Sequence, residues 1–136
     1  MIFKGYISSG SLSDNSIVDQ SIQNMVIWNS CEKRGLQYHL SATEYGISNC
    51  FLVLNQILKD LKKNKYEGVA FYSLAQLPLN FNKRKKIYEA TVSRGKQILF
   101  SLENLLINNK EKIEDIEQII QIQNLLKFCP KNFQIR

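Results

Sequence analysis

The sequence has few of the residues that bind metals or cross-link secreted proteins. Among its 136 residues there is one histidine, His39, and there are three cysteines, Cys31, Cys50 and Cys129. The cysteines are widely spaced and form no Cys-x-x-Cys pair, which argues against a disulfide framework and a structural zinc site. One imidazole is too few for a zinc or non-haem iron site. We expect reduced thiols, no metal and no cofactor.

Long apolar runs are also missing, and glycine and proline are scarce. The longest apolar stretches span a few residues, whereas a membrane-spanning helix needs about 20, and the N-terminus has no secretory leader. Six glycines and two prolines exclude the fibrous and disordered classes, and 44% hydrophobic residues with 22% charged residues are typical of a globular protein. We therefore expect a cytoplasmic protein without a membrane span.

The formal net charge of +6 is unevenly distributed along the chain. One lysine-rich run, at 59–65, ends a predicted helix, where cations are favourable. A second run, from Lys83 to Lys86, opens a predicted helix, where positive charge costs up to about 1 kcal/mol. A bound anion such as a phosphate would offset that cost, and a solvated face is the simpler alternative.

Strand and helix patterns alternate about four times. Short apolar or alternating segments predict strands at 2–7, 36–41, 69–72 and 97–102. Apolar residues at helical spacing predict helices at 16–34, 49–61, 82–94 and 111–128. The candidate caps are Asp14, Asn15 or Ser16 for the first helix, Ser48 or Asn49 for the second and Asn82 for the third. The last helix places one face along Ile113, Ile116, Ile119, Ile120, Gln123 and Leu126.

This alternation predicts the α/β fold class. We expect a single domain over residues 1–129, followed by a C-terminal tail over residues 130–136. The domain is an open, mainly parallel sheet of about four strands in the order 2-1-3-4, flavodoxin-like, with helices on both faces and a C-terminal helix. The stretch from Val69 to Tyr72 is almost continuously apolar, which predicts a central strand covered on both faces.

Polar side chains gather near the expected carboxyl ends of the strands. Open α/β sheets bind ligands there, at the crevice where the strand order reverses, here between the first and third strands. Hydroxyls, amides and a carboxylate suit hydrogen bonding to a sugar or a phosphate, although the same residue types also populate turns and caps. The ligand-binding candidates are Tyr6, Ser8, Ser9, Ser41, Thr43, Glu44, Tyr45, Asn49, Tyr72, Ser73 and Gln76.

No spacing in the sequence specifies a catalytic centre. The segment Ser8-Ser9-Gly10-Ser11 matches neither of the glycine motifs that bind nucleotide phosphates. Cys50 could be a thiolate at a helix N-terminus, but a cysteine beside apolar residues is more often part of the core. No serine, histidine and acid arrangement defines a triad. Whether the protein is an enzyme stays open.

Several motifs, in their order, resemble a small bacterial family known as sporadic carbohydrate cluster proteins. The resemblance covers most of the chain and is carried by Phe3 to Ser9, by the Ser-Ala-Thr-Glu-Tyr string that begins at Ser41, and by the Tyr-Ser-Leu-x-Gln-Leu-Pro string that ends at Pro78. It implies a role in surface polysaccharide biosynthesis, with a sugar or nucleotide-sugar at the carboxyl ends of strands one and three. No reaction comes with the family.

The chain also resembles the catalytic domain of serine recombinases. Its opening Gly-Tyr strand, its glutamine-rich first helix and its apolar third strand followed by a loop carry this second likeness. The likeness implies a resolvase-like fold. It argues against strand exchange, because Ser8-Ser9-Gly10 and Ala75-Gln76-Leu77-Pro78 stand where recombinases have a nucleophilic serine and arginines.

Three functions stay open from the sequence. The first, which we favour, is binding of a sugar or nucleotide-sugar in surface-carbohydrate synthesis. The second is a nucleic-acid-binding protein with a resolvase-like fold that lacks the recombinase catalytic residues, with nucleic acid the less favoured partner. The third is a non-catalytic subunit that forms a homo-oligomer through the C-terminal helix.

Overall fold

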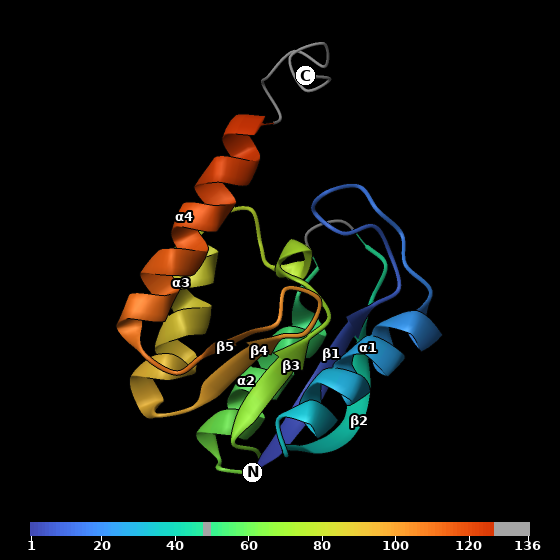
Figure 1. The fold of residues 1–136 in the computed structure, drawn as a ribbon, viewed down its shortest axis with the longest axis vertical. Coiled ribbons are helices and arrows are strands. Elements are labelled where there is room, and N and C mark those ends of the chain that lie inside the picture. The colour runs from blue at the N-terminus through green and yellow to red at the C-terminus, as the bar shows by residue number, and fades with distance from the viewer. Residues whose placement is uncertain (48–49, 127–136) are drawn as a thin grey trace.

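A five-stranded sheet forms the centre of the structure, a computed structural model that describes residues 1–47 and 50–126 (Figure 1). The strand order is β2-β1-β3-β4-β5, and every neighbouring pair is parallel except β4 and β5. The predicted order 2-1-3-4 is confirmed. The strands are β1 (Ile2–Ser8), β2 (Gln37–Glu44), β3 (Gly68–Phe71), β4 (Gln97–Phe100) and β5 (Leu105–Ile107).

Two strand predictions were wrong at their ends. The expected strand at 97–102 stops at Phe100, and the chain turns through Asn104 at a φ of 56° into β5, which the sequence did not predict. The second strand does not end near Ser41, because β2 continues to Glu44 in register with Ser8 of β1. Two residues of β2, at 40 and 41, face Gly5 in a β-bulge, which breaks the alternation from which the strand was predicted.

The four main helices form where the apolar spacing predicts them, but their caps differ. Helix α1 begins at Gln20, not at 16, because Asp14 accepts hydrogen bonds from Ser16 in a turn that precedes the helix. The cap of α3 is Asn80 and not Asn82. The proposed caps of α2 and the C-terminal tail fall at 48–49 and 130–136, outside the described residues. The helices are α1 (Gln20–Lys33), α2 (Leu52–Lys62), α3 (Phe81–Ala90) and α4 (Lys110–Leu126), with the short 3-10 helices η1 (Leu74–Gln76) and η2 (Val92–Arg94).

Helices cover both faces of the sheet, as predicted (Figure 1). Val69 and Phe71 of β3 join the apolar cluster of α2, α3 and α4, whereas Ala70 joins the cluster of α1. All four residues of β3 are buried, so this strand is central and covered on both faces. Among the helices of residues 1–47 and 50–126, none is long and apolar enough to cross a membrane.

Helix α4 is held to the body by its first half. Ile116 is fully buried, and Ile113, Ile119 and Ile120 pack against the same cluster. The rest of the predicted face does not follow, because Gln123 and Leu126 are exposed. Figure 1 shows why: α4 extends past the end of the sheet, so among the described residues no strand or helix lies beneath its last turns.

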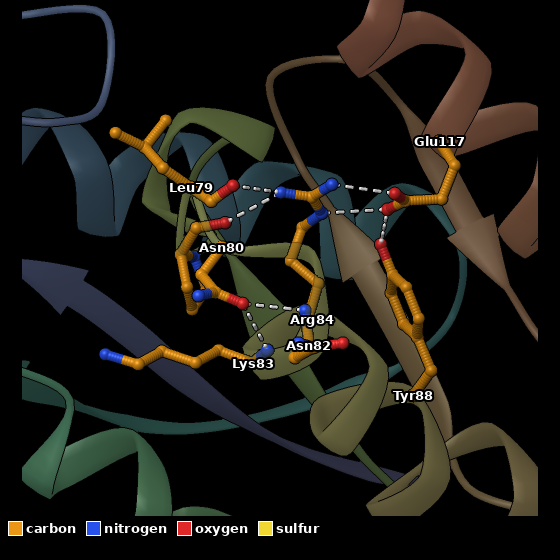
Figure 2. Close-up of polar contacts among 8 residues, drawn as sticks. Leu79, Asn80, Asn82, Lys83, Arg84, Tyr88 and Glu117 are labelled. Carbon is orange, nitrogen blue, oxygen red and sulfur yellow. Dashed lines mark hydrogen bonds and ion pairs between the residues drawn. The ribbon is translucent and has the colours of Figure 1, made fainter.

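A partly buried ion pair also joins α3 to α4 (Figure 2). Arg84 donates from Nε and Nη2 to the Glu117 carboxylate, over 2.9 and 2.8 Å, and from Nη1 to the carbonyl oxygens of Pro78 and Leu79, over 3.1 and 2.8 Å. Tyr88 donates its hydroxyl to the same carboxylate over 2.5 Å. Within the run from Lys83 to Lys86, the arginine is therefore neutralised inside the protein, whereas the three lysines are exposed.

The charges in this cluster shift the pKa values of its members. Burial raises the pKa of Glu117, but the hydrogen bonds from Arg84 and Tyr88 and the charge of Arg84 outweigh it, so the pKa lies below its ordinary value. The hydrogen bond to Glu117 is the main cause that raises the pKa of Arg84. Burial raises the pKa of Tyr88, and hydrogen bonding to Glu117 adds to the effect. Glu117 is therefore more easily ionised in the folded protein than in the unfolded chain.

This ion pair predicts a loss of stability in acid. A carboxylate whose pKa is lowered by folding stabilises the protein above its unfolded pKa, here near 4.5, and this contribution is lost as the pH falls through the folded value. At neutral pH we expect Glu117→Gln to lower the free energy of unfolding by about 1–3 kcal/mol, with a smaller difference at about pH 3. Urea unfolding of both proteins measures the difference. The matched control is Glu114→Gln, an exposed position on the same helix. A Glu117 effect that did not depend on pH would contradict this account.

Candidate functional site

A pocket of about 370 Å³ opens at the carboxyl ends of the first three strands. Tyr6 of β1 pairs in register with Phe71 of β3, so these two strands end side by side, as the sequence predicted. The loop after β1, the end of β2, the start of α2 and the segment from η1 to α3 contribute the walls. The lining residues are Tyr6, Ser8, Gly10, Ser11, Leu12, Ser13, Asn15, Glu44, Tyr45, Gly46, Ile47, Cys50, Phe51, Ala75, Gln76, Leu77, Pro78 and Leu79.

The structure brings five of the sequence candidates together at this pocket: Tyr6, Ser8, Glu44, Tyr45 and Gln76. The other described candidates do not line it. Asn49 lies outside the described residues. Two of them form hydrogen bonds elsewhere: Ser9 donates to the backbone carbonyl of Glu44, and Ser41 bonds the Tyr38 hydroxyl. Thr43 pairs with Ile7 in the sheet, and Tyr72 is buried in the α1 cluster. Ser73 caps η1.

Glu44 is tied into the fold by its carboxylate. It accepts hydrogen bonds from the Tyr6 hydroxyl over 2.9 Å and from the backbone N–H groups of Val53 and Leu54 over 3.0 and 3.1 Å. Those two N–H groups belong to the first turn of α2, where helix donors have no partner of their own and negative charge is favourable. The buried carboxylate at the end of β2 therefore caps the next helix.

Tyr6, on the neighbouring strand β1, is held by the same carboxylate. Burial raises the pKa of its phenol, and the charge of Glu44 and the hydrogen bond to it raise that pKa further. The phenol therefore stays protonated and keeps its hydrogen bond to the carboxylate. Tyr6 and Glu44 form a rigid floor of the pocket rather than a pair of free ligand groups.

The side chains of Gln76 and Ser73 likewise form hydrogen bonds with the backbone. Gln76 accepts from the N–H groups of Tyr72 and Ser73 over 2.6 and 3.2 Å, and it donates to the Tyr6 carbonyl over 3.1 Å. Ser73 accepts from the N–H of Ala75 and donates to Glu103 over 2.7 Å. These contacts close the turn after β3 and join it to β1.

Ser8 is the hydroxyl that this network presents to the pocket. Its backbone N–H and carbonyl both bond the side-chain amide of Gln23, over 2.9 and 2.8 Å, and its Oγ accepts from Gln76 over 3.0 Å. A hydroxyl that accepts one bond still has a hydrogen to donate. Ser8 is thus fixed from two sides, with a donor available to a ligand.

Gln23 was missed by the sequence reasoning, although the sequence carries a signal for it. It is fully buried on α1 and also donates to the carbonyl of Val18. It lies four residues before the buried Ile27, so a polar side chain occupies the apolar face of the helix. A buried amide must find hydrogen-bond partners, and here it finds the exit of β1.

The pocket has polar and apolar lining residues, and none of the described ones is cationic. Among its described lining residues there is no lysine or arginine, and Glu44, whose carboxylate is already hydrogen-bonded, is the one formal charge. Tyr45 is 60% exposed and Phe51 is half-buried, so aromatic surface borders the opening. Hydroxyl donors beside aromatic rings suit a neutral, hydroxyl-rich ligand, and the described lining has no cationic side chain to pair with a phosphate.

Of two further reactive side chains, Cys50 and His39, one lines the pocket. Cys50 lines the pocket and directs its thiol at Glu44, 3.8 Å away. His39 is not among the lining residues; it contacts Lys4 and the ring of Tyr66. Within the described part of the chain, no three side chains of the His, Cys, Asp and Glu types group closely enough to hold a metal ion.

Comparison with known proteins identifies the fold but no family. No protein-family model matches the sequence, and no curated protein matches it. A resolvase family site-specific recombinase from Streptococcus pneumoniae superposes with a TM-score of 0.63 and 13% identity, over 90% of this chain and 88% of that one. The N-terminal catalytic domain of TP901-1 integrase superposes with a TM-score of 0.62 and 15% identity, over 91% of this chain and 95% of that one. The chain is a single α/β domain that resembles the resolvase fold.

These results separate the two resemblances drawn from the sequence. The resolvase-like fold is confirmed, whereas the likeness to sporadic carbohydrate cluster proteins gains no support from the comparisons. The two segments where the sequence resemblance predicted departures from recombinase motifs, around Ser8 and around Ala75-Gln76, both line the pocket. The two structures thus share the backbone fold with this chain at 13% and 15% identity.

The capping role of Glu44 predicts that its removal destabilises the protein. We expect Glu44→Gln to lower the free energy of unfolding by about 1–3 kcal/mol, because one amide oxygen cannot accept from all these donors and the amide N–H₂ would face backbone N–H groups. Urea unfolding measures the change. Glu32→Gln, at an exposed position on α1, is the matched control. Equal stability of the two variants would show that Glu44 does not hold α2.

Proposed function

We propose that the chain binds a sugar, or the sugar part of a nucleotide-sugar, in the pocket at the carboxyl ends of β1 and β3. The observation that carries the proposal is the composition of the pocket: a fixed Ser8 donor, further serines in the loop after β1, and no described lysine or arginine. Its volume of about 370 Å³ is in the range of small-molecule sites, at the small end.

The biological setting that we propose is surface-carbohydrate synthesis in the cytoplasm. It rests on the sequence strings from Ser41 and from Tyr72, which resemble those of sporadic carbohydrate cluster proteins. Whether the sugar is only bound or also converted is left open by the proposal, because the lining side chains include no pair of a nucleophile and a free base. A phosphate group of a nucleotide-sugar would extend out of the pocket.

A nucleic-acid-binding role is the second candidate. It is favoured by the net charge of +6 and by the exposed lysines at 83, 85 and 86, and the fold neighbours include a site-specific recombinase. Those lysines lie on α3, and none of them lines the pocket. A role on DNA would therefore use the helix surface and leave the pocket unexplained, which is why we rank it second.

Sugar binding is tested by saturation-transfer NMR with a panel of methyl glycosides and nucleotide sugars. We expect a glycoside to bind, and we expect Ser8→Ala to weaken that binding about tenfold, by removing one hydrogen bond of about 1.4 kcal/mol. Ser21→Ala, an exposed serine on α1, is the matched control. A blank panel, or equal losses in the two variants, would count against the proposal.

Salt dependence separates the two candidates. A neutral sugar should keep its affinity within about twofold between 50 and 200 mM salt, whereas DNA held by several lysine contacts loses orders of magnitude. Duplex DNA is titrated under the same conditions, with the triple variant Lys83→Gln/Lys85→Gln/Lys86→Gln. Steeply salt-dependent DNA binding that the triple variant abolishes, with a blank glycoside panel, would favour the second candidate instead.

A homo-oligomeric subunit is a further role, and the last turns of α4 favour it. Ile122, Leu125 and Leu126 are exposed by 57%, 68% and 52%, on a helix that extends past the sheet. Packing this surface against a second copy would remove it from water. We expect light scattering to give a dimer for the chain and a monomer for Ile122→Glu/Leu126→Glu. Gln118→Glu is the control on the same helix, and a strict monomer of the unchanged chain would exclude this role.

A further inference from the structure

One guanidinium contacts the wall of the pocket and the C-terminal helix at the same time. Nη1 of Arg84 donates to the carbonyl oxygens of Pro78 and Leu79, two residues that line the pocket. Nε and Nη2 of the same group donate to Glu117 on α4. Figure 2 shows the planar group between the loop on one side and the carboxylate on the other.

The geometry of arginine makes these two contacts interdependent. The guanidinium is planar, so its five N–H directions are fixed relative to one another. A shift of Glu117 therefore rotates or displaces Nη1 as well as Nε. Arg84 is buried to 7% exposure, which leaves little room for the group to move without disturbing the loop.

The contacts that position α4 lie in its first half. Ile116 is its one fully buried side chain in the described part, and Glu117 follows it directly. The later turns extend past the sheet, where a partner or a second copy could contact them (Figure 1). Glu117 lies on the same helix as these turns, and Ile119 and Ile120, which pack against the core cluster, connect the two parts.

We propose that Arg84 is a positioning residue that makes the pocket wall at Pro78 and Leu79 depend on how α4 is docked. The docking of α4 and the occupancy of the pocket are then linked, so a change that favours one arrangement of the helix alters ligand affinity, and ligand binding alters the helix in return. The part of this inference that concerns ligand affinity rests on the proposed function. The part that concerns the wall does not.

The alternative is that the cluster only fastens α3 to α4. Two variants separate the alternatives. Tyr88→Phe removes one hydrogen bond to Glu117 but leaves both sets of Arg84 contacts in place. The exchange Arg84→Glu/Glu117→Arg keeps an ion pair between the helices, but a glutamate at 84 has no hydrogen to donate to the loop carbonyls.

The wall is tested first without any ligand, by amide NMR of the ¹⁵N-labelled full chain. We expect Glu117→Gln to shift the amide signals of Leu77 and Leu79 and of Tyr45 across the pocket. Glu114→Gln and Tyr88→Phe should leave them in place. The exchanged pair should keep α4 docked, with its α4 signals near those of the unchanged chain, and still shift Leu77 and Leu79. Changes confined to α3 and α4 in Glu117→Gln would overturn the inference.

If Glu117→Gln does not fold, Arg84→Lys replaces it, because one ammonium cannot bond Glu117 and two loop carbonyls in this arrangement.

A second experiment measures the affinity for the glycoside that the panel selects. We expect Glu117→Gln to weaken it about 5- to 20-fold, with Glu114→Gln unchanged. An unchanged affinity beside a shifted wall would overturn the link to binding. A panel without any binder would contradict the proposed function. The amide NMR comparison, which needs no ligand, would still decide the role of Arg84.

Discussion

Gln76 connects the exits of two neighbouring strands, and the shape of the pocket depends on that connection. Its amide oxygen accepts from the backbone after β3, and its amide nitrogen donates to Tyr6 and Ser8 of β1. Gln23 holds Ser8 from the opposite side of the sheet exit. Because both amides are buried, losing either partner would leave polar groups without hydrogen bonds, at a cost of about 1–3 kcal/mol each. The two glutamines thus fix where β1 ends and which way the Ser8 hydroxyl faces.

Polar side chains around the pocket divide into those that build it and those that remain for a ligand. Glu44 accepts hydrogen bonds from the backbone of α2, and Gln76 accepts one from the backbone just before η1. The charge of Arg84 is paired with that of Glu117. What remains at the opening is neutral: serine hydroxyls and the ring of Tyr45. The chain is basic as a whole, yet its pocket is not, and this separation of charge from the pocket is the main reason to favour a sugar over a phosphate-rich ligand.

Sequence patterns were sufficient for the order of the first four strands and for the place of the pocket. Both follow from apolar periodicity, which decides helices, strands and the buried central segment at β3. They were not sufficient where a long-range partner decides a local feature. The bulge opposite Gly5, on the neighbouring strand, lengthened β2. The cap of α3 was a local miss, because Asn80 accepts from the backbone of Asn82, two residues on. The roles of the polar residues were hidden by long-range partners: Glu44 is bonded to Tyr6, 38 positions away, and Arg84 to Glu117, 33 positions away. Spacing along a chain does not reveal such pairs.

Binding of a neutral sugar beside Ser8 is the proposal on which the role of the pocket depends. The most direct measurement is a titration of the ¹⁵N-labelled chain with the glycoside that binds best, followed by amide chemical shifts along the whole described chain. The account predicts that the largest changes lie at Ser8, at Ser11 to Ser13 and at Tyr45, and that the amides of Lys83 to Lys86 hardly move. Changes centred on the lysines of α3, or no changes around Ser8, would contradict it.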